Sequence, residues 1–255
     1  MIPELAALLS ESVTQSLEDK VAISFSGGLD STLIAHVAKK SAEVELYCAG
    51  MPDSEDMLVA RKVSEEMGLP MKCAIFEEKT VLETYGKCYS IVKGDLLKVE
   101  LLVPVYAIAE IAKKDGQKVM LFGTAAEELF AGYERYYLYL EEGKDVGSIL
   151  REEFKNLEKR EIAWIKKICK KFDIEARFPL YSKEIAELMF SVPLEERMAD
   201  RELKKPILRE AAKLMGVPET AVKRRKKAMQ YGSGIHKIIM KNTVELNLSY
   251  PFNGF

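Results

Sequence analysis

One short segment sets the architecture of this 255-residue chain: Lys20-Val21-Ala22-Ile23-Ser24-Phe25-Ser26-Gly27-Gly28-Leu29-Asp30-Ser31. Residues 21–25 form an apolar run that predicts a buried strand, and apolar residues recur at helical spacing from Leu33 to Ala38. Strand, turn and helix therefore follow one another without spare residues. Gly27 and Gly28 allow a sharp turn and a close approach of a ligand to the backbone. The N–H groups of this turn should meet beside the positive end of the helix, where they would form a phosphate site.

Asp30 is the unusual member of this segment, because a carboxylate repels phosphate unless a cation lies between them. We interpret Asp30 as a ligand for Mg²⁺ on the pyrophosphate of ATP. The alternative is that Asp30 or Ser31 simply caps the helix. The segment matches neither the Gly-Lys-Ser/Thr loop nor the Gly-x-Gly-x-x-Gly pattern. It resembles instead the PP-loop of ATP pyrophosphatases, which cleave ATP between the α- and β-phosphates.

The composition is that of an ordinary globular protein, with 48% hydrophobic and 31% charged residues. A formal net charge of −2 argues against a general nucleic-acid binder, so no nucleic-acid partner is expected. We find no membrane-length apolar run and no signal-peptide pattern at the start of the chain. Four widely spaced cysteines indicate reduced thiols and a cytoplasmic location.

Strand and helix patterns alternate in the first half of the chain. Strands are expected at 21–25, 44–50, 71–76 and 117–123, and helices of 10–15 residues separate them. This alternation predicts an α/β fold with a doubly wound, mostly parallel sheet. Gly50 and Gly123 fall at predicted strand ends, as do the loop glycines, so one shared ligand site is expected there.

The second half is expected to be helical, because strand patterns stop after about Gly132. Helices are expected at 133–142, 149–171, 183–191 and 206–215. We therefore divide the chain into an ATP-binding half, 1–142, and a mainly helical half, 143–255, that packs on it or continues the same domain. A basic run at 223–227 fits a pyrophosphate clamp, a nucleic-acid patch or a solvated helix face.

A second motif leads to a family resemblance: Leu121-Phe122-Gly123-Thr124-Ala125-Ala126-Glu127-Glu128-Leu129-Phe130-Ala131-Gly132-Tyr133-Glu134-Arg135-Tyr136. It resembles the Ser-Gly-Glu-Gly-x-Asp-Glu-x-Phe-Gly-Gly-Tyr segment of the synthetase domain of asparagine synthetases. The downstream segment 203–210 and the segments 49–52 and 177–180 also match, so the resemblance runs from about residue 15 to 240. It implies an adenine nucleotide α-hydrolase-like fold of the PP-loop type, with ATP and Mg²⁺ as cofactors.

The resemblance assigns roles to individual residues. Asp30 and Glu127 match the metal-binding carboxylates, and Lys205 matches a lysine that stabilises the adenylation transition state, so these three are the catalytic candidates. The residues expected to bind ATP are Ser24, Ser26, Gly27, Gly28, Asp30, Ser31, Gly50, Gly123 and Lys205. The candidates for the substrate side are Thr124, Glu100, Arg177, Lys227 and Tyr231.

Two departures from the family pattern concern the acid substrate. Thr124 stands where asparagine synthetases have a glutamate and β-lactam synthetases a tyrosine. Glu100 falls about where the family has an arginine, and a carboxylate there would repel the α-carboxylate of aspartate.

The function implied is an amide ligase that forms AMP and pyrophosphate. It would adenylate a carboxylate and transfer it to ammonia or an amine, with aspartate to asparagine as the leading case. The alternatives are another acid, a tRNA base, or a subunit that binds ATP or AMP without catalysis. The chain starts at Met1-Ile2-Pro3 and goes straight to the synthetase part, so we expect free ammonia, another amine or a separate glutaminase subunit to supply nitrogen. A homo-oligomer is left open.

Overall fold

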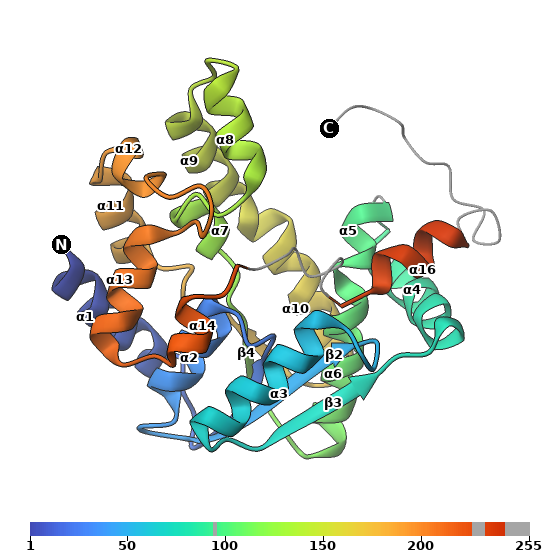
Figure 1. Ribbon diagram of the computed structural model, residues 1–255. Coiled ribbons are helices and arrows are strands. Elements are labelled where there is room, and N and C mark those ends of the chain that lie inside the picture. Colours follow the sequence, from blue (N-terminus) through green and yellow to red (C-terminus); the bar gives the residue numbers. More distant parts are fainter. Residues whose placement is uncertain (94–95, 226–232, 243–255) are drawn as a thin grey trace.

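The computed structural model describes residues 1–93, 96–225 and 233–242. At its centre lies a five-stranded parallel sheet of order β3-β2-β1-β4-β5 (Figure 1). The strands are β1 (Lys20–Ser24), β2 (Glu43–Gly50), β3 (Met71–Ile75), β4 (Val119–Leu121) and β5 (Glu175–Arg177). Strand order reverses between β1 and β4, and ligand sites of such sheets form in the crevice at the carboxyl ends of those strands.

Helices cover both faces of the sheet, which confirms the predicted doubly wound α/β fold. One face carries α1 (Ile2–Gln15), α2 (Leu29–Ala38), α3 (Glu55–Met67), α11 (Lys183–Ser191), α13 (Pro206–Met215) and α14 (Glu219–Val222). The other face carries α4 (Glu78–Val92), α5 (Leu96–Glu100), α6 (Leu102–Lys114), α10 (Glu161–Lys171) and α16 (Ile235–Lys241). Side chains alternate between the two layers along β1: Val21 and Ile23 belong to one core and Ala22 to the other.

A smaller helical group stands beside the sheet. It consists of α7 (Ala126–Leu129), α8 (Glu134–Glu141), α9 (Val146–Asn156) and α12 (Leu194–Arg197), of which α8 and α9 project from the body (Figure 1). Tyr136, Leu150 and Met198 form a separate hydrophobic cluster there. This group begins where β4 ends, so its first residues reach the edge of the sheet.

Two expectations for the second half are wrong. The chain beyond Gly132 is not free of strands, because Glu175–Arg177 adds β5 beside β4. The helix expected over 149–171 is interrupted: α9 ends at Asn156, a 3₁₀ turn covers Leu157–Lys159, and α10 begins at Glu161. Leu157 is buried in the core at this break, which lets α10 pack against the opposite face of the sheet.

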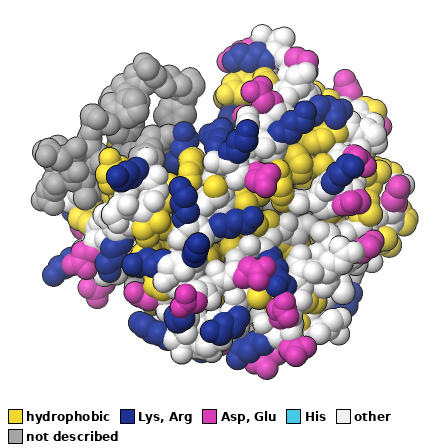
Figure 2. All heavy atoms as spheres, turned by 180° about the vertical axis from the view of Figure 1, so that it is seen from behind, with side chains coloured by type: hydrophobic (Ala, Val, Ile, Leu, Met, Phe, Trp, Pro, Cys, Tyr) yellow, Lys and Arg dark blue, Asp and Glu magenta, His cyan; other side chains and the backbone are white. Residues whose placement is uncertain are grey.

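The outer surface carries mixed charges. On the rear face, basic and acidic side chains are interspersed with exposed hydrophobic groups (Figure 2). Among the helices that the structure describes, none has the length and apolar character needed to cross a bilayer. The division of the chain at residue 142 stays a prediction, although β5 shows that the second half contributes to the sheet.

Candidate active site

The loop between β1 and α2 is a tight turn that depends on Gly27. This residue has φ +65°, and a Cβ built on it would lie 2.9 Å from backbone atoms of Val59 and Ala60 in α3. Backbone cannot yield at that distance as a flexible side chain can, so only glycine fits. The result is a loop pressed between the sheet edge and α3.

A hydroxyl ties this loop together from inside. The Ser31 Oγ accepts a hydrogen bond from the Ser26 N–H at 3.3 Å and donates to the carbonyl of Gly28 at 3.3 Å. Gly28 is the N-cap of α2 and has no side chain to fill the helix terminus. The loop is therefore closed around the positive end of α2, which suits an anion.

The ammonium of Lys205 joins the two predicted metal carboxylates. Its Nζ lies 2.8 Å from Asp30 Oδ2, 3.1 Å from Asp30 Oδ1 and 2.9 Å from Glu127 Oε1. Burial lowers the pKa of Lys205, but the two carboxylates outweigh that effect and raise the pKa above its usual value, so the side chain stays charged. Three residues from distant parts of the sequence thus lie in direct contact through Lys205, and their roles in binding and catalysis stay a prediction.

Asp30 and Glu127 fit the donor set that Mg²⁺ takes together with phosphates. Magnesium in such sites is held by one or two carboxylates plus substrate oxygens. Asp30 lies in the first turn of α2, beside the loop, and Glu127 lies on α7 just beyond β4. In the described residues, no group of three or more His, Cys, Asp and Glu could hold a metal alone.

Lys205 is held in an unusual backbone conformation. Lys204 and Lys205 have φ +59° and +55°, and Pro206 then starts α13. The guanidinium of Arg209 donates to the carbonyl of Lys204 at 2.6 Å and to the carbonyl of Leu203. Left-handed conformations are costly for residues with a Cβ, so these bonds explain how the strained turn persists.

Glu127 owes its position to small residues around it. A Cβ on Gly132 would lie 1.8 Å from Glu127 Oε2 and 2.3 Å from Lys205 Cε. Ala125 and Ala131 have φ +85° and +51°, although alanine disfavours this region. Both stand where the quoted synthetase segment has glycine, so the chain keeps a glycine-type backbone there at some cost in stability.

Arg224, in the described part of the basic run, contacts the loop. Its Nη1 donates to the carbonyl of Ser26 at 2.6 Å, and its Nη2 pairs with the buried Asp56 of α3 at 2.6 Å. Arg224 therefore braces the backbone of the loop. Lys223 next to it is exposed and pairs with Glu219.

Gly50 and Gly123 lie at the same edge of the sheet. A Cβ on Gly123 would lie 3.2 Å from Asp30 Cβ. Beyond Gly50, the N–H of Met51 donates to the carbonyl of Ser233 at 3.0 Å. The segment that leads into α16 therefore lies beside the end of β2.

The substrate-side candidates are placed differently from one another. Thr124 follows β4 and is half-buried, next to the site. The Arg177 guanidinium donates hydrogen bonds to Glu18, to Glu175 and to the carbonyl of Ser16. Its role on the substrate side stays a prediction. Lys227 and Tyr231 lie outside the described residues.

The position of Glu100 does not support the expectation that its carboxylate faces and repels a substrate carboxylate. It is fully buried, and both its oxygens lie within hydrogen-bond distance of His236 Nδ1, at 3.0 and 3.1 Å. The carboxylate of Glu100 is therefore buried and paired with the imidazole of His236. Sequence reasoning missed His236, because one histidine on a short helix gives no pattern.

Glu128 was also missed, although it stands beside Glu127 in the matched motif. Burial, and next the charge of Glu127, raise the pKa of Glu128 to about 7. The adjacent acidic residues Glu127 and Glu128 in the motif were the signal that could have drawn attention to it. A buried carboxylate that titrates near neutrality is common at functional sites.

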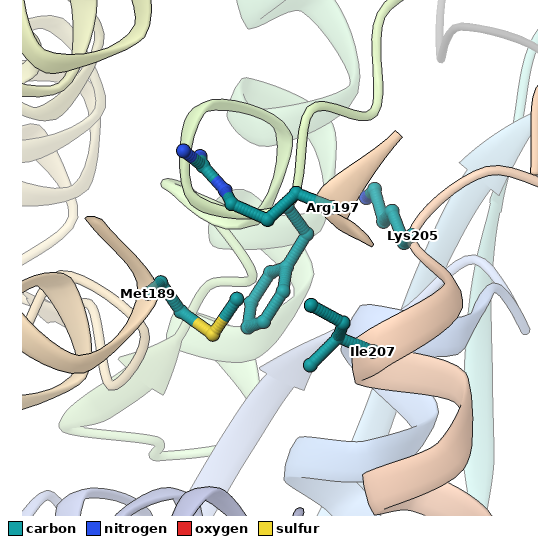
Figure 3. Close-up of a pocket in the computed structure, with 5 residues that line it drawn as sticks. Met189, Arg197, Lys205 and Ile207 are labelled. Atoms are coloured by element: carbon teal, nitrogen blue, oxygen red, sulfur yellow. The ribbon is translucent and has the colours of Figure 1, made fainter. Parts of the chain in front are cut away.

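A small cavity lies behind Lys205. Phe130, Met189, Arg197 and Ile207 line it together with Lys205 (Figure 3). The Arg197 guanidinium donates to the carbonyls of Glu128 and Leu129, which fixes α7 from that side. The cavity, of about 110 Å³, is a packing gap that is too small for a nucleotide.

Comparison with known proteins adds a family match over nearly the whole chain. A family model described as asparagine synthase matches residues 4–163 and 140–249. The glutamine-hydrolyzing asparagine synthetase 1 assigned to Methanocaldococcus jannaschii is 32% identical over 88% of this chain and 47% of its own length. Asparagine synthetase B of Escherichia coli, also named as glutamine-hydrolyzing, is 24% identical over 91% of this chain and 45% of its own length. The chain thus spans about half the length of these relatives.

Among solved structures, the NMN synthetase of Francisella tularensis is similar, with a TM-score of 0.45 at 12% identity. That similarity covers 99% of this chain and 97% of the other.

Proposed function

Because this chain belongs to the asparagine synthase family, we propose that it is an ATP-dependent ligase that adenylates a carboxylate and transfers the acyl group to ammonia or an amine. The observation that carries the proposal is the contact of Lys205 with both Asp30 and Glu127. It puts a fixed ammonium next to the two carboxylates that would accompany the phosphates. The activity would yield AMP and pyrophosphate.

In the first step, the loop would hold the phosphates of ATP. Its backbone N–H groups and the N-terminus of α2 favour negative charge, the Ser26 hydroxyl adds a donor, and Ser31 holds the shape of the loop. Asp30 and Glu127 would hold Mg²⁺, which when bound neutralises phosphate charge. Arg224 braces the loop through the Ser26 carbonyl.

Lys205 would act where two negative groups must meet. The substrate carboxylate attacks the α-phosphorus, and pyrophosphate leaves as negative charge accumulates between them. A buried ammonium, already charged and fixed by its neighbours, stabilises that charge without reorganising. The residues mainly orient the reactants and offset charge.

Aspartate, with asparagine as product, is the instance that we propose first. Thr124 and Glu100 replace the residues that the family resemblance leads one to expect on the acid side. Another acid therefore stays the alternative within the same reaction. The nitrogen would come from ammonia, from another amine, or from glutamine through a separate glutaminase subunit.

The test is acid-dependent exchange of labelled pyrophosphate into ATP. Purified protein is incubated with ATP, Mg²⁺ and one acid at a time from a panel that begins with aspartate. We expect one acid to support exchange, and we expect Lys205→Gln to abolish it. If no acid in a broad panel supports exchange, the proposed ligase function is wrong. Parallel reactions with ammonium and with glutamine then identify the nitrogen donor.

A further inference from the structure

Arg209 is a buried guanidinium that binds backbone carbonyls of two separate segments. It lies on α13, keeps 7% of its surface exposed, and donates to the carbonyls of Leu203, Lys204, Val222 and Arg224. The bond from Nε to Lys204 measures 2.6 Å, and the bond from Nη2 to Arg224 measures 3.0 Å. Burial of a charged group is costly unless hydrogen bonds compensate for it, and these bonds go to the main chain. Arg209 therefore fixes the two segments relative to each other.

The first segment is the strained turn that carries Lys205. Arg209 binds the carbonyls of residues 203–205 in succession, the first two through its guanidinium and that of Lys205 through its own N–H at 3.0 Å. From this turn the ammonium of Lys205 reaches Asp30 and Glu127. The place of the ammonium thus depends on the bonds that Arg209 makes.

The second segment carries Arg224, which contacts the phosphate loop. The Nη1 of Arg224 donates to the carbonyl of Ser26 at 2.6 Å, and its Nη2 pairs with Asp56 at 2.6 Å. Arg209 binds the main-chain carbonyl of the same Arg224. A continuous series of contacts therefore runs from the turn of Lys205, through Arg209 and Arg224, to the loop.

We propose that Arg209 is a positioning residue for adenylation, which sets the spacing between the Lys205 ammonium and the phosphate loop. This inference rests on the proposed ligase function. The ammonium can stabilise charge only where it meets the α-phosphate, and the loop determines where the phosphates lie. Lysine cannot replace Arg209, because one compact ammonium does not span carbonyls on both sides as the planar guanidinium does.

Mg²⁺ binding tests the place of Lys205 without any turnover. If Arg209→Lys releases the turn, the ammonium leaves the two metal carboxylates, and Mg²⁺ alone should raise the melting temperature of this variant more than that of the unaltered protein. Arg151→Lys is the matched control: Arg151 donates to the carbonyl of Phe190 at 2.6 Å, and the same replacement there should leave the response to Mg²⁺ unchanged. An equal rise in Arg209→Lys and in the unaltered protein would overturn the inference.

Acid-dependent pyrophosphate exchange in the full chain measures the consequence for the reaction. For Arg209→Lys we expect the maximal rate per folded molecule to fall by about 100-fold. The KM for ATP should stay nearly unchanged, because Arg224 still holds the loop through Ser26. A purely structural defect would lower the melting temperature and leave the rate per folded molecule intact. Ile168→Ala, in the core on the opposite face of the sheet, should show that pattern.

A double variant tests the series of contacts. Arg209→Lys combined with Arg224→Lys should lose less activity than the product of the two single losses, because either break releases the same spacing. Losses that multiply would overturn the inference. If Arg209→Lys does not fold, Arg209→Gln takes its place in every assay, since its amide keeps a donor for one carbonyl.

Failure of the inference and failure of the proposed function give different results. An unchanged maximal rate in folded Arg209→Lys would overturn the inference alone. Absence of exchange in the unaltered protein with every acid would remove the proposed function. In that case the Mg²⁺ comparison still decides whether Arg209 places the ammonium of Lys205.

Discussion

Gly132→Ala tests the geometry of the site most sharply, because the structure fixes what the added methyl group meets. The new Cβ would lie 1.8 Å from Glu127 Oε2 and 2.3 Å from Lys205 Cε, whereas ordinary contacts begin near 3.4 Å. The carboxylate of Glu127 therefore has to move by roughly 1.5 Å. Both colliding atoms belong to flexible side chains, and Gly132 is not among the described glycines with positive φ. The fold should survive while the site is displaced.

A displacement of this size costs on the order of 100-fold in rate, because the reacting groups no longer meet in the productive geometry. The assay is acid-dependent pyrophosphate exchange, with thermal unfolding measured in parallel. Gly86→Ala is the matched control: Gly86 lies within α4, and nothing lies within 4 Å of its Cβ position. This control should keep full exchange and gain about 0.5–1 kcal/mol of stability.

A different result would refute this account of the site. If Gly132→Ala kept the exchange rate of the control, Glu127 and Lys205 would not need their observed positions. If the variant lost exchange only because it unfolded, the added methyl group would have displaced the backbone and not only the side chains of Glu127 and Lys205. Mg²⁺ titration of the variant adds a direct check, since displacement of Glu127 should weaken the dependence of exchange on the metal.

Three further predictions follow from the same contacts. Lys205→Met removes a counter-charge from Asp30 and Glu127, so Mg²⁺ should raise its melting temperature more than that of the unaltered protein; an equal rise in both contradicts a carboxylate metal site. For Glu128, the folded chain holds a proton more tightly than the unfolded chain between about pH 4.5 and 7, so stability falls as pH rises through that range. Glu128→Gln should remove this fall. The free energy of unfolding is measured at pH 5 and pH 8, and an equal decrease in the variant and in the parent would show the reasoning to be wrong. Ala131→Gly should relieve the left-handed strain and stabilise the protein by about 1 kcal/mol, or about 2–4 °C in melting temperature, whereas an unchanged or lower melting temperature would mean that the backbone there is not strained.

The sequence predicted the parallel sheet, apart from β5, because the signals there are local. The segment from Lys20 to Ser31 combines strand, glycine turn and helix start, and the predicted strands at 21–25, 44–50 and 117–123 carry buried apolar runs. The cluster of Asp30, Glu127 and Lys205 came from motif matches in three segments. Their contact then follows from the fold, because the first two lie beyond the ends of adjacent strands.

The features that were missed depend on distant contacts. Strand β5 has one buried residue, Ala176, between the charged Glu175 and Arg177, so its pattern looks like a loop. Its strand character comes from pairing with β4. Glu100 and His236 are separated by 135 intervening residues, and His236 has no periodic or motif context. Only the packing of α16 on α5 brings them together.

The oxygen atoms of the acid substrate test the central claim most directly. If a carboxylate attacks the α-phosphorus, one of its oxygens stays on the phosphate when the amine displaces AMP. With an acid labelled with ¹⁸O in its carboxylate, ATP, Mg²⁺ and ammonium, mass spectrometry should find one ¹⁸O in the AMP formed. AMP without label, or ADP in place of AMP, would contradict the adenylation that Lys205, Asp30 and Glu127 are proposed to support.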